Sequence, residues 1–460
     1  MAAACLLLFA QVSSDWYVTR DGASYLSIAR SLAQQGAPTN LGQQQLFFAP
    51  CYSFLIAPLY WISDRPILAL SLLNAALGVA LLFSTRSWIS RFAPDDAALI
   101  AATCVINASV GILLRRTLSE ALFMPAMVVT VLLLEHVRAA TVERLPVRAA
   151  LGAGVALAMV CLTRQAGLTT LPGFAIALGV TTSRSGASWR RAAMVLALVA
   201  VPALAAVAGL GAYERATAVE DARTYADFLA ADSQSFPAQV RTGLVLRISE
   251  IGRVALPGMF KAAPDASTSG WLNFSLYAAT ALAVVYGAVR MLRRNPDTFL
   301  CIAPFYVALY VVWPFDEGIR FLAPLAPVWL IGLYFALPEV PALRRRVAWL
   351  SLITHAIVAV GYWLANDRPE ARRDNAEWPA LDRLAQSIDV QAGPVAWQLD
   401  GRDHERAMFQ LSIDRPVNNA STKEAVAEDV TWLVTTTGAL PADFDKITTG
   451  GNYTLWRRRP

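Results

Sequence analysis

The sequence predicts an all-α polytopic membrane protein with about 10–11 transmembrane helices, additional interfacial helices and a small C-terminal α/β domain outside the membrane. The 460-residue chain is 56% hydrophobic and only 16% charged, with a mean hydropathy of +0.44. A soluble domain carries more charge than this. About ten apolar segments are long enough, or nearly so, to cross ~30 Å of hydrocarbon. Arginine marks every second gap between these segments.

The apolar segments define the topology that we expect. They lie at roughly 66–85, 95–114, 119–137, 147–163, 166–182, 192–212, 271–289, 298–314, 319–337 and 347–364. Arginines occupy five of the gaps as Arg86 and Arg91; Arg138, Arg144 and Arg148; Arg184, Arg190 and Arg191; Arg290, Arg293 and Arg294; and Arg344, Arg345 and Arg346. Basic residues stay in the cytoplasm during insertion, so all five sets are expected on one side. The formal charge of +5 therefore indicates orientation and not nucleic-acid binding.

The N-terminal part is expected to combine one membrane crossing with an external loop. Residues 1–12 are apolar but too short to span, and we expect them to be the end of a first transmembrane helix. Residues 13–65 must then be external. In this loop DGASYLSIARSLAQQG repeats apolar residues at helical spacing, which predicts an amphipathic interfacial helix. The following FFAPCYSFLIAPLYWI, with its prolines and aromatics, is typical of a re-entrant or interfacial segment.

The remaining external gaps lie at 115–118, at CLTRQAGL, at 213–270 and at 314–318. Within 213–270, DARTYADFLAAD has the spacing of a helix. We divide the chain into a transmembrane domain, 1–366, and a polar extracytoplasmic α/β domain, 367–460. In the second domain WPALDRLAQSI predicts an amphipathic helix, and PVAWQL, TWLVTTT and NYTLWRR predict strands.

Several kinds of chemistry have no sequence signal here. The five cysteines contain no CxxC pair, which disfavours a disulfide or zinc framework. The three histidines are scattered, and the external acids are too dispersed for an evident oxygen cage around a cation. No GxGxxG, P-loop or metalloprotease motif occurs. We therefore expect no metal and no cofactor.

Two acidic residues at external helix ends are candidates for proton transfer. Asp21 opens the amphipathic helix, where a carboxylate is either an ordinary cap or a general base at the membrane surface. Glu120 lies close to Arg115 and Arg116 at the outer end of a helix pair. An ionisable group near hydrocarbon is a functional candidate, and the alternative is a local ion pair or helix cap.

Four arginines are candidates for binding an anion. Arg115, Arg116 and Arg164 lie in external turns, where the positive-inside bias predicts none. A guanidinium fork suits a phosphate, and three near one membrane surface indicate a lipid phosphate; snorkelling anchors are the alternative. Arg320 lies about one turn inside the helix that follows WPFDEG, and it either binds phosphate or pairs with one of the two acids before it.

These segments together resemble the GT-C fold, polyprenyl-phosphate-sugar-dependent glycosyltransferases, in particular the protein O-mannosyltransferases and the aminoarabinose transferases of lipid A. The matching pieces are DGASYLSIARSL, FFAPCYSFLIAPLYW, RRTLSEALFM, LTRQAGLTTLPG and RFLAPLAPVWL, spread over residues 15 to 340. Each piece alone is weak. Their order, spacing and external placement make the set fairly specific.

The resemblance implies a glycosyltransferase of the plasma (inner) membrane, with its active site and C-terminal domain extracytoplasmic. Its donor would be a polyprenyl-phosphate sugar, and its acceptor a lipid, a glycan or a protein. Asp21 would be the catalytic carboxylate and Glu120 a second acid, while Arg164 and Arg320 would contact the donor phosphate. The segment 213–270 would help to cover the site.

The resemblance also has a departure. Many relatives carry an acidic pair in the first loop, whereas here Asp21 is followed by Gly22. Tyr25 and Tyr52, one in each matching segment of this loop, are the expected substrate contacts.

Two other functions remain open from sequence. A transporter or flippase of a lipid-linked saccharide is the main alternative, although transport favours internal repeats and charges in the middle of helices. The third is a non-catalytic assembly protein that uses 367–460 as its binding module.

Overall fold

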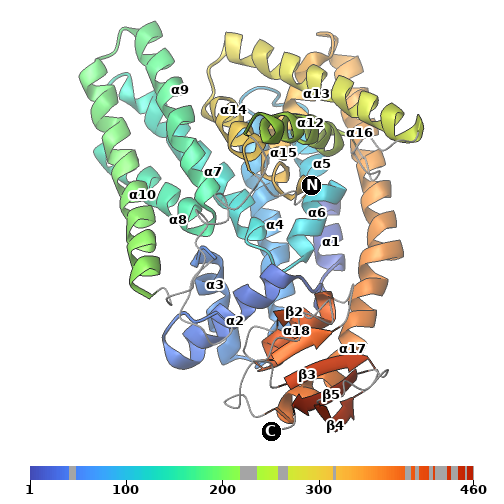
Figure 1. The fold of residues 1–460 in the computed structure, drawn as a ribbon. Helices are drawn as coiled ribbons and strands as arrows, with labels where there is room; N and C mark the ends of the chain where they lie inside the picture. Colours follow the sequence, from blue (N-terminus) through green and yellow to red (C-terminus); the bar gives the residue numbers. More distant parts are fainter. Residues whose placement is uncertain are drawn as a thin grey trace.

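A computed structural model shows a helical bundle with a small sheet at one end (Figure 1). The structure describes residues 1–40, 48–217, 236–256, 268–313, 318–388, 395–398, 403–413, 418–419, 432–436, 444–450 and 453–458. The predicted helix in DARTYADFLAAD lies outside these residues. In Figure 1 the helices α2, α3 and α18 and the strands gather at the lower end, and the turn between α9 and α10 lies at the upper end.

The helices follow the chain order that the apolar pattern predicts. The N-terminal half contains α1 (Ala2–Ala10), α2 (Arg20–Gln35), α3 (Cys51–Ile56), the 3-10 turn η1 (Ala57–Trp61), α4 (Ile67–Ile89), α5 (Ala97–Ile106), α6 (Ala108–Arg115), α7 (Glu120–Thr141), α8 (Val147–Thr163), η2 (Gln165–Thr169), α9 (Thr170–Ser185) and α10 (Trp189–Thr217). The second half contains α12 (Phe236–Ala255), α13 (Thr268–Arg294), α14 (Thr298–Val311), η3 (Gly318–Arg320), η4 (Ala323–Leu325), α15 (Ala326–Ala336), α16 (Pro341–Tyr362), the π turn η5 (Trp363–Asp367), α17 (Arg368–Gln386) and α18 (Asp403–Ile413).

This is a multi-pass membrane protein, but fewer helices are full-length spans than the sequence predicts. Among the described residues, six helices are long and apolar enough to cross a membrane, and the bent pair α5–α6 would make a seventh. The other three predicted spans are the shorter apolar helices α8, α14 and α15. Helix α15 is short because the described chain before it, from Gly318 to Leu325, contains two 3-10 turns, and Pro324 in the second of them lacks a backbone N–H donor.

The predicted span at 95–114 is interrupted at Asn107. The chain bends there by 57° between α5 and α6. The Asn107 side chain caps α6 by accepting from the backbone N–H of Ser109 at 2.8 Å, and it donates to the carbonyl of Val254 in α12 at 2.7 Å. The Asn107 side chain thus both donates and accepts a hydrogen bond in a buried environment, and these two bonds stabilise the break between α5 and α6.

The arginine-rich turns meet at one end of the bundle, as the topology predicts. Arg91, from the turn after α4, contacts Glu135 of α7 and Asp297 at the start of α14. Arg138 donates to the same Glu135, with Nη2 at 2.6 Å. Three further hydrogen bonds lie at this end, two from Arg191 to the carbonyls of Thr141 and Val142 and one from Arg345 to Asp96.

Glu135 is the centre of this end and gives a stability prediction. Its carboxylate is buried and also accepts from the backbone N–H of Thr298 at 2.9 Å. Glu135→Gln leaves Arg138 without its ionic partner, and breaking a buried pair in this way costs about 3–5 kcal/mol. We expect a clearly lower unfolding temperature for the detergent-purified variant in a fluorescence melt. Glu143→Gln, an exposed change just beyond the same helix, is the control, and equal melting of both variants would contradict the assignment.

The C-terminal part is joined to the bundle by one continuous helix. Helices α16 and α17 run through the π turn from Pro341 to Gln386, which is 46 residues. At about 1.5 Å per residue this is about 69 Å, more than twice the ~30 Å of hydrocarbon, so the helix is longer than one membrane crossing requires. Figure 1 shows its second part, α17, beside the strands at the lower end. The boundary predicted between 366 and 367 therefore falls inside a continuous helix.

The C-terminal sheet has five strands in the order β2-β1-β3-β5-β4. They are β1 (Val395–Gln398), β2 (Asn418–Asn419), β3 (Trp432–Thr436), β4 (Phe444–Gly450) and β5 (Tyr453–Arg458). Strand β1 pairs in parallel with β2 and β3, and β5 pairs antiparallel with β3 and β4. The three predicted strands correspond to β1, β3 and β5. Buried side chains of the sheet and of α17 belong to the same apolar core as the bundle.

Candidate active site

Four residues that are far apart in the sequence form one charge cluster: Asp21, Glu120, Arg164 and Arg320. Arg320 bridges the two acids. Its Nη1 donates to Oδ2 of Asp21 at 2.5 Å, and its Nε donates to Glu120. Nη1 of Arg164 donates to the same oxygen of Glu120. Two carboxylates balance two guanidinium groups, and they come from the starts of α2 and α7, the end of α8 and η3.

Asp21 does not cap its helix. The cap of α2 is Thr19, whose hydroxyl accepts from the backbone N–H of Gly22 at 2.9 Å. The Asp21 side chain instead reaches Arg320 and keeps 27% of its surface exposed. It is the more accessible acid of the cluster, because the Glu120 side chain is fully buried.

Gly22 explains the departure from the acidic pair. A Cβ at this position would lie 2.7 Å from the Thr19 hydroxyl oxygen and 3.1 Å from the backbone carbonyl of Thr117. A side chain at position 22 would therefore require Thr19 and the Thr117 carbonyl to shift where the start of α2 touches the turn before α7. The second carboxylate of the cluster comes from that neighbouring segment instead, as Glu120.

Glu120 holds the two arginines in place. It is the first residue of α7, follows a serine that makes no capping bond, and turns its carboxylate to Arg164 and Arg320. Arg164 follows α8 in an extended conformation, with φ −154° and ψ 130°. A carboxylate without solvent contact needs such compensation, and charge-assisted bonds to guanidinium groups provide it.

The structure corrects the expected location of Arg320. It lies in the 3-10 turn η3, not one turn inside the following helix, because α15 begins only at Ala326. Gly318 opens this turn with φ +63°, a conformation that L side chains rarely adopt. The two acids of WPFDEG lie outside the described residues, and the described acidic partners of Arg320 are Asp21 and Glu120.

Arg115 and Arg116 are not part of the cluster. Nε and Nη2 of Arg115 donate to Asp367 at 3.1 and 2.5 Å, and Nη2 of Arg116 lies 3.6 Å from the other oxygen of that carboxylate. Asp367 belongs to the π turn between α16 and α17, and it is buried. The bend at Asn107 directs α6 toward this turn. The two arginines therefore fasten the long C-terminal helix to the bundle.

The pairing with Asp367 predicts that Arg115 stabilises the fold and does not bind the donor lipid. Arg115→Gln removes the main partner of a buried carboxylate, and we expect a loss of stability of about 3–5 kcal/mol. Polyprenyl-phosphate affinity should stay at the wild-type level, because Arg164 and Arg320 are untouched. Thermal melts and a lipid-binding titration measure the two effects separately. An unfolding temperature equal to that of wild type, together with lost lipid binding, would instead show that Arg115 binds the donor phosphate.

Tyr25 and Tyr52 are both buried beside the cluster and pack on each other, with ring centroids 5.4 Å apart. The Tyr52 hydroxyl donates to Oδ1 of Asn74 at 3.1 Å. Burial, together with the negative charges of Asp21 and Glu120, raises the pKa of Tyr25 above its ordinary value. Its phenol therefore stays protonated at neutral pH. Because both tyrosine side chains are buried, the structure favours packing beside the cluster as the role of Tyr25 and Tyr52 over direct contact with substrate.

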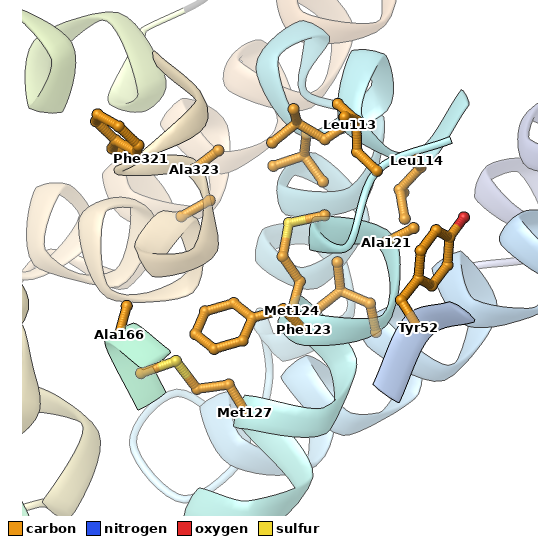
Figure 2. Packing of buried hydrophobic residues seen from close by; sticks show 14 of the residues in the cluster. Tyr52, Leu113, Leu114, Ala121, Phe123, Met124, Met127, Ala166, Phe321 and Ala323 are labelled. Carbon is orange, nitrogen blue, oxygen red and sulfur yellow. The ribbon is translucent and has the colours of Figure 1, made fainter. Parts of the chain in front are cut away.

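An apolar layer lies behind the charges. Figure 2 shows Phe123 and Met127 of α7 on the side that faces Ala166 and Ala323, and all four belong to one buried cluster. Next to it, Phe321 stacks on Tyr310 with centroids 4.2 Å apart. These groups exclude water from the inner side of the cluster, which strengthens its electrostatic interactions.

A further buried ion pair lies in α12, in a segment where the sequence predicts no charged site. Arg247 and Glu250 of α12 lie 2.5 Å apart, and both side chains are almost fully buried. The Arg247 guanidinium lies 5.2 Å from the ring centroid of Phe321, the residue after Arg320. The pair occurs in VLRISEIGRV, whose apolar residues repeat at helical spacing. This helical spacing lies inside the segment 213–270, which the topology predicts to be an external loop and in which the structure has α12.

Comparison with known proteins identifies the fold class. No family model and no curated protein matches the sequence. Solved structures match at full length, and they show that the chain has the GT-C fold. The resemblance expected from the sequence segments is confirmed at the level of the fold.

Two solved structures illustrate the likeness. ArnT from Cupriavidus metallidurans bound to undecaprenyl phosphate has a TM-score of 0.61 at 13% identity, over 99% of this chain and 96% of that chain. The archaeal oligosaccharyltransferase AglB from Archaeoglobus fulgidus, in complex with an inhibitory peptide and a dolichol-phosphate, has a TM-score of 0.56 at 11% identity, over 95% of this chain and 68% of that chain.

Proposed function

We propose that this protein is a membrane glycosyltransferase that moves a sugar from a polyprenyl-phosphate donor to an extracytoplasmic lipid, glycan or protein. The cluster of Asp21, Glu120, Arg164 and Arg320 carries the proposal. It lies at the end of the bundle opposite the arginine-rich turns, because Glu120 begins α7 and Arg138 lies in the last turn of the same helix. The two neighbours, which were solved with undecaprenyl phosphate and with a dolichol-phosphate, support this donor class.

Asp21 is the proposed general base. The acceptor oxygen or nitrogen attacks the anomeric carbon of the sugar, and its proton passes to the Asp21 carboxylate. The bond between that carbon and the phosphate oxygen breaks, and the polyprenyl phosphate leaves. Attack opposite the leaving group inverts the anomeric configuration. Glu120 is too buried to reach an acceptor, so we assign it the positioning of both arginines.

Arg164 and Arg320 are the proposed donor-phosphate ligands. Guanidinium groups that are already held in place stabilise the charge that develops on the leaving phosphate. Arg320 also neutralises Asp21 in the structure described here. A donor phosphate competes for this guanidinium, and drawing it away from Asp21 would leave the carboxylate free to accept a proton. The donor would then prepare the base before transfer.

The first experiment is a transfer assay with purified full-length protein. Radiolabelled polyprenyl-phosphate sugars are supplied as donors and a membrane extract as acceptor, and label in the acceptor fraction is measured. We expect transfer from one donor class, with release of polyprenyl phosphate. The proposal would be overturned in favour of a transporter if the protein moved intact lipid-linked sugar across the membrane of vesicles and transferred sugar from none of the donors.

A further inference from the structure

A cavity of about 310 Å³ lies between the first external segment and the C-terminal helices. Its walls come from α2, from the turn before α4, and from α17 and α18. Its size falls at the lower end of small-molecule sites, which measure about 300–1,000 Å³. The polar side chains that line it include Arg30, Asp64, Arg65, Asp382, Gln386 and Ser412.

The cavity carries both signs of charge. Arg65 pairs with Asp382 and lies over the Trp378 ring, 4.5 Å from its centroid. The Ser412 hydroxyl donates to Asp382 at 2.5 Å, and Arg30 donates to the carbonyl of Leu411 at 3.0 Å. These contacts hold the charged groups in place around the cavity. Two arginines and two aspartates suit a ligand with one group of each sign, and a purely anionic or cationic ligand would meet a like charge.

The cavity also lies beside an apolar surface. Phe54, Trp61 and Ile62 are 54%, 75% and 76% exposed, and they lie within ten residues before the lining residue Asp64. Ile67, which lines the cavity, begins the membrane-spanning helix α4. Aromatic and aliphatic side chains exposed at the start of a span lie in the membrane interface. The cavity therefore opens at the membrane surface, where alkyl chains are available.

The cavity is separate from the charge cluster. Arg30 lies nine residues after Asp21 on α2 (30 − 21), which is about two and a half turns, so the two side chains leave opposite faces of the helix. A ligand in the cavity is thus not the donor lipid at Arg164 and Arg320.

We propose that this cavity binds the zwitterionic headgroup of a membrane phospholipid that carries a primary ammonium group. The phosphate binds Arg30 and Arg65, the ammonium binds Asp64 and Asp382, and the acyl chains lie along Trp61 and Ile62 and their neighbours. Because the walls come from α2 and from the C-terminal helices, the lipid joins these two parts at the membrane surface. The site does not depend on the proposed glycosyltransferase activity.

The test measures lipid binding to the delipidated full-length protein in detergent. Short-chain phosphatidylethanolamine, phosphatidylglycerol with the same chains, and glycerophosphoethanolamine without chains are titrated by calorimetry. We expect saturable binding of phosphatidylethanolamine at least tenfold tighter than that of either other probe. Equal affinity for phosphatidylglycerol overturns the zwitterion preference. Equal affinity for the chain-free headgroup overturns the lipid assignment, since a soluble phosphate ester would then be sufficient.

Matched variants locate the site. Asp64→Asn changes an exposed lining residue with little risk to folding, and it should weaken phosphatidylethanolamine binding about tenfold. Arg65→Gln should weaken it at least as much. Arg383→Gln, an exposed residue of α17 that does not line the cavity, should bind like wild type. Unchanged binding in both lining variants would place the lipid elsewhere. Donor-lipid titration of the same variants should match wild type, which separates this test from the proposed function.

Discussion

Asp21→Asn is expected to abolish sugar transfer while leaving the donor bound. Asparagine keeps the shape of the side chain and an oxygen that can accept from Arg320, but it cannot take up a proton as a carboxylate does. A positioned general base contributes roughly 10²–10⁴-fold to the rate, and we expect kcat to fall by that factor. Glu120 keeps compensating both arginines in the variant, so the unfolding temperature should remain close to that of wild type.

The control for this variant is Asp15→Asn, the same chemical change six residues earlier in the chain. Asp15 lies 3.8 Å from an exposed arginine, Arg372, and takes no part in the cluster. Its transfer rate should equal that of wild type. Full activity of Asp21→Asn would rule out Asp21 as the base, and activity lost together with donor binding would make it a binding residue.

Arg320→Gln is expected to weaken donor binding and to slow transfer. The substitution removes one of two guanidinium groups from the proposed phosphate site and also the bridge to Asp21. Loss of one preorganised charge-stabilising donor typically lowers kcat by about 10²–10³-fold. Arg320→Lys should recover only part of this loss, because one ammonium group does not reproduce a planar fork that contacts two carboxylates.

The measurement is a titration with polyprenyl phosphate followed by single-turnover transfer. Arg372→Gln is the matched control, because this arginine is exposed and, among the described residues, its ionic contact is the long one to Asp15. Glu120 retains Arg164 as an ionic partner in Arg320→Gln, so the fold is expected to persist. Wild-type affinity and rate in that variant would show that Arg320 only balances buried charge.

Much of the fold could be predicted because the membrane restricts what a chain can do. Apolar length and the distribution of arginine are local properties of the sequence, and hydrocarbon allows few alternatives to a helix. What the apolar pattern does not predict is a bend at a place where a side chain replaces backbone hydrogen bonds. Asn107 interrupts a segment that looks uniformly apolar, and its partner Val254 lies in α12, far along the chain.

In the C-terminal sheet, too, only part of the structure can be predicted from the sequence. Strands β1, β3 and β5 were predicted from their apolar residues, and the described positions of β3 and β5 are largely buried. Strand β4 lies at the edge of the sheet, exposes most of its residues and contains an irregularity between Lys446 and Thr448. An edge strand with few buried side chains leaves only a weak alternating pattern to detect.

Apolar length and arginine placement are sufficient to predict the class of fold, the two ends of the bundle and the acids and arginines from which the site is drawn. Which of these charged residues meet depends on how the helices pack. Arg164 and Arg320 converge on Glu120, whereas Arg115 and Arg116 are bound to Asp367. Burying an unpaired guanidinium group is costly, and an ion pair with a carboxylate offsets this cost. Which carboxylate is within reach depends on the bend at Asn107 and on the path of the long C-terminal helix.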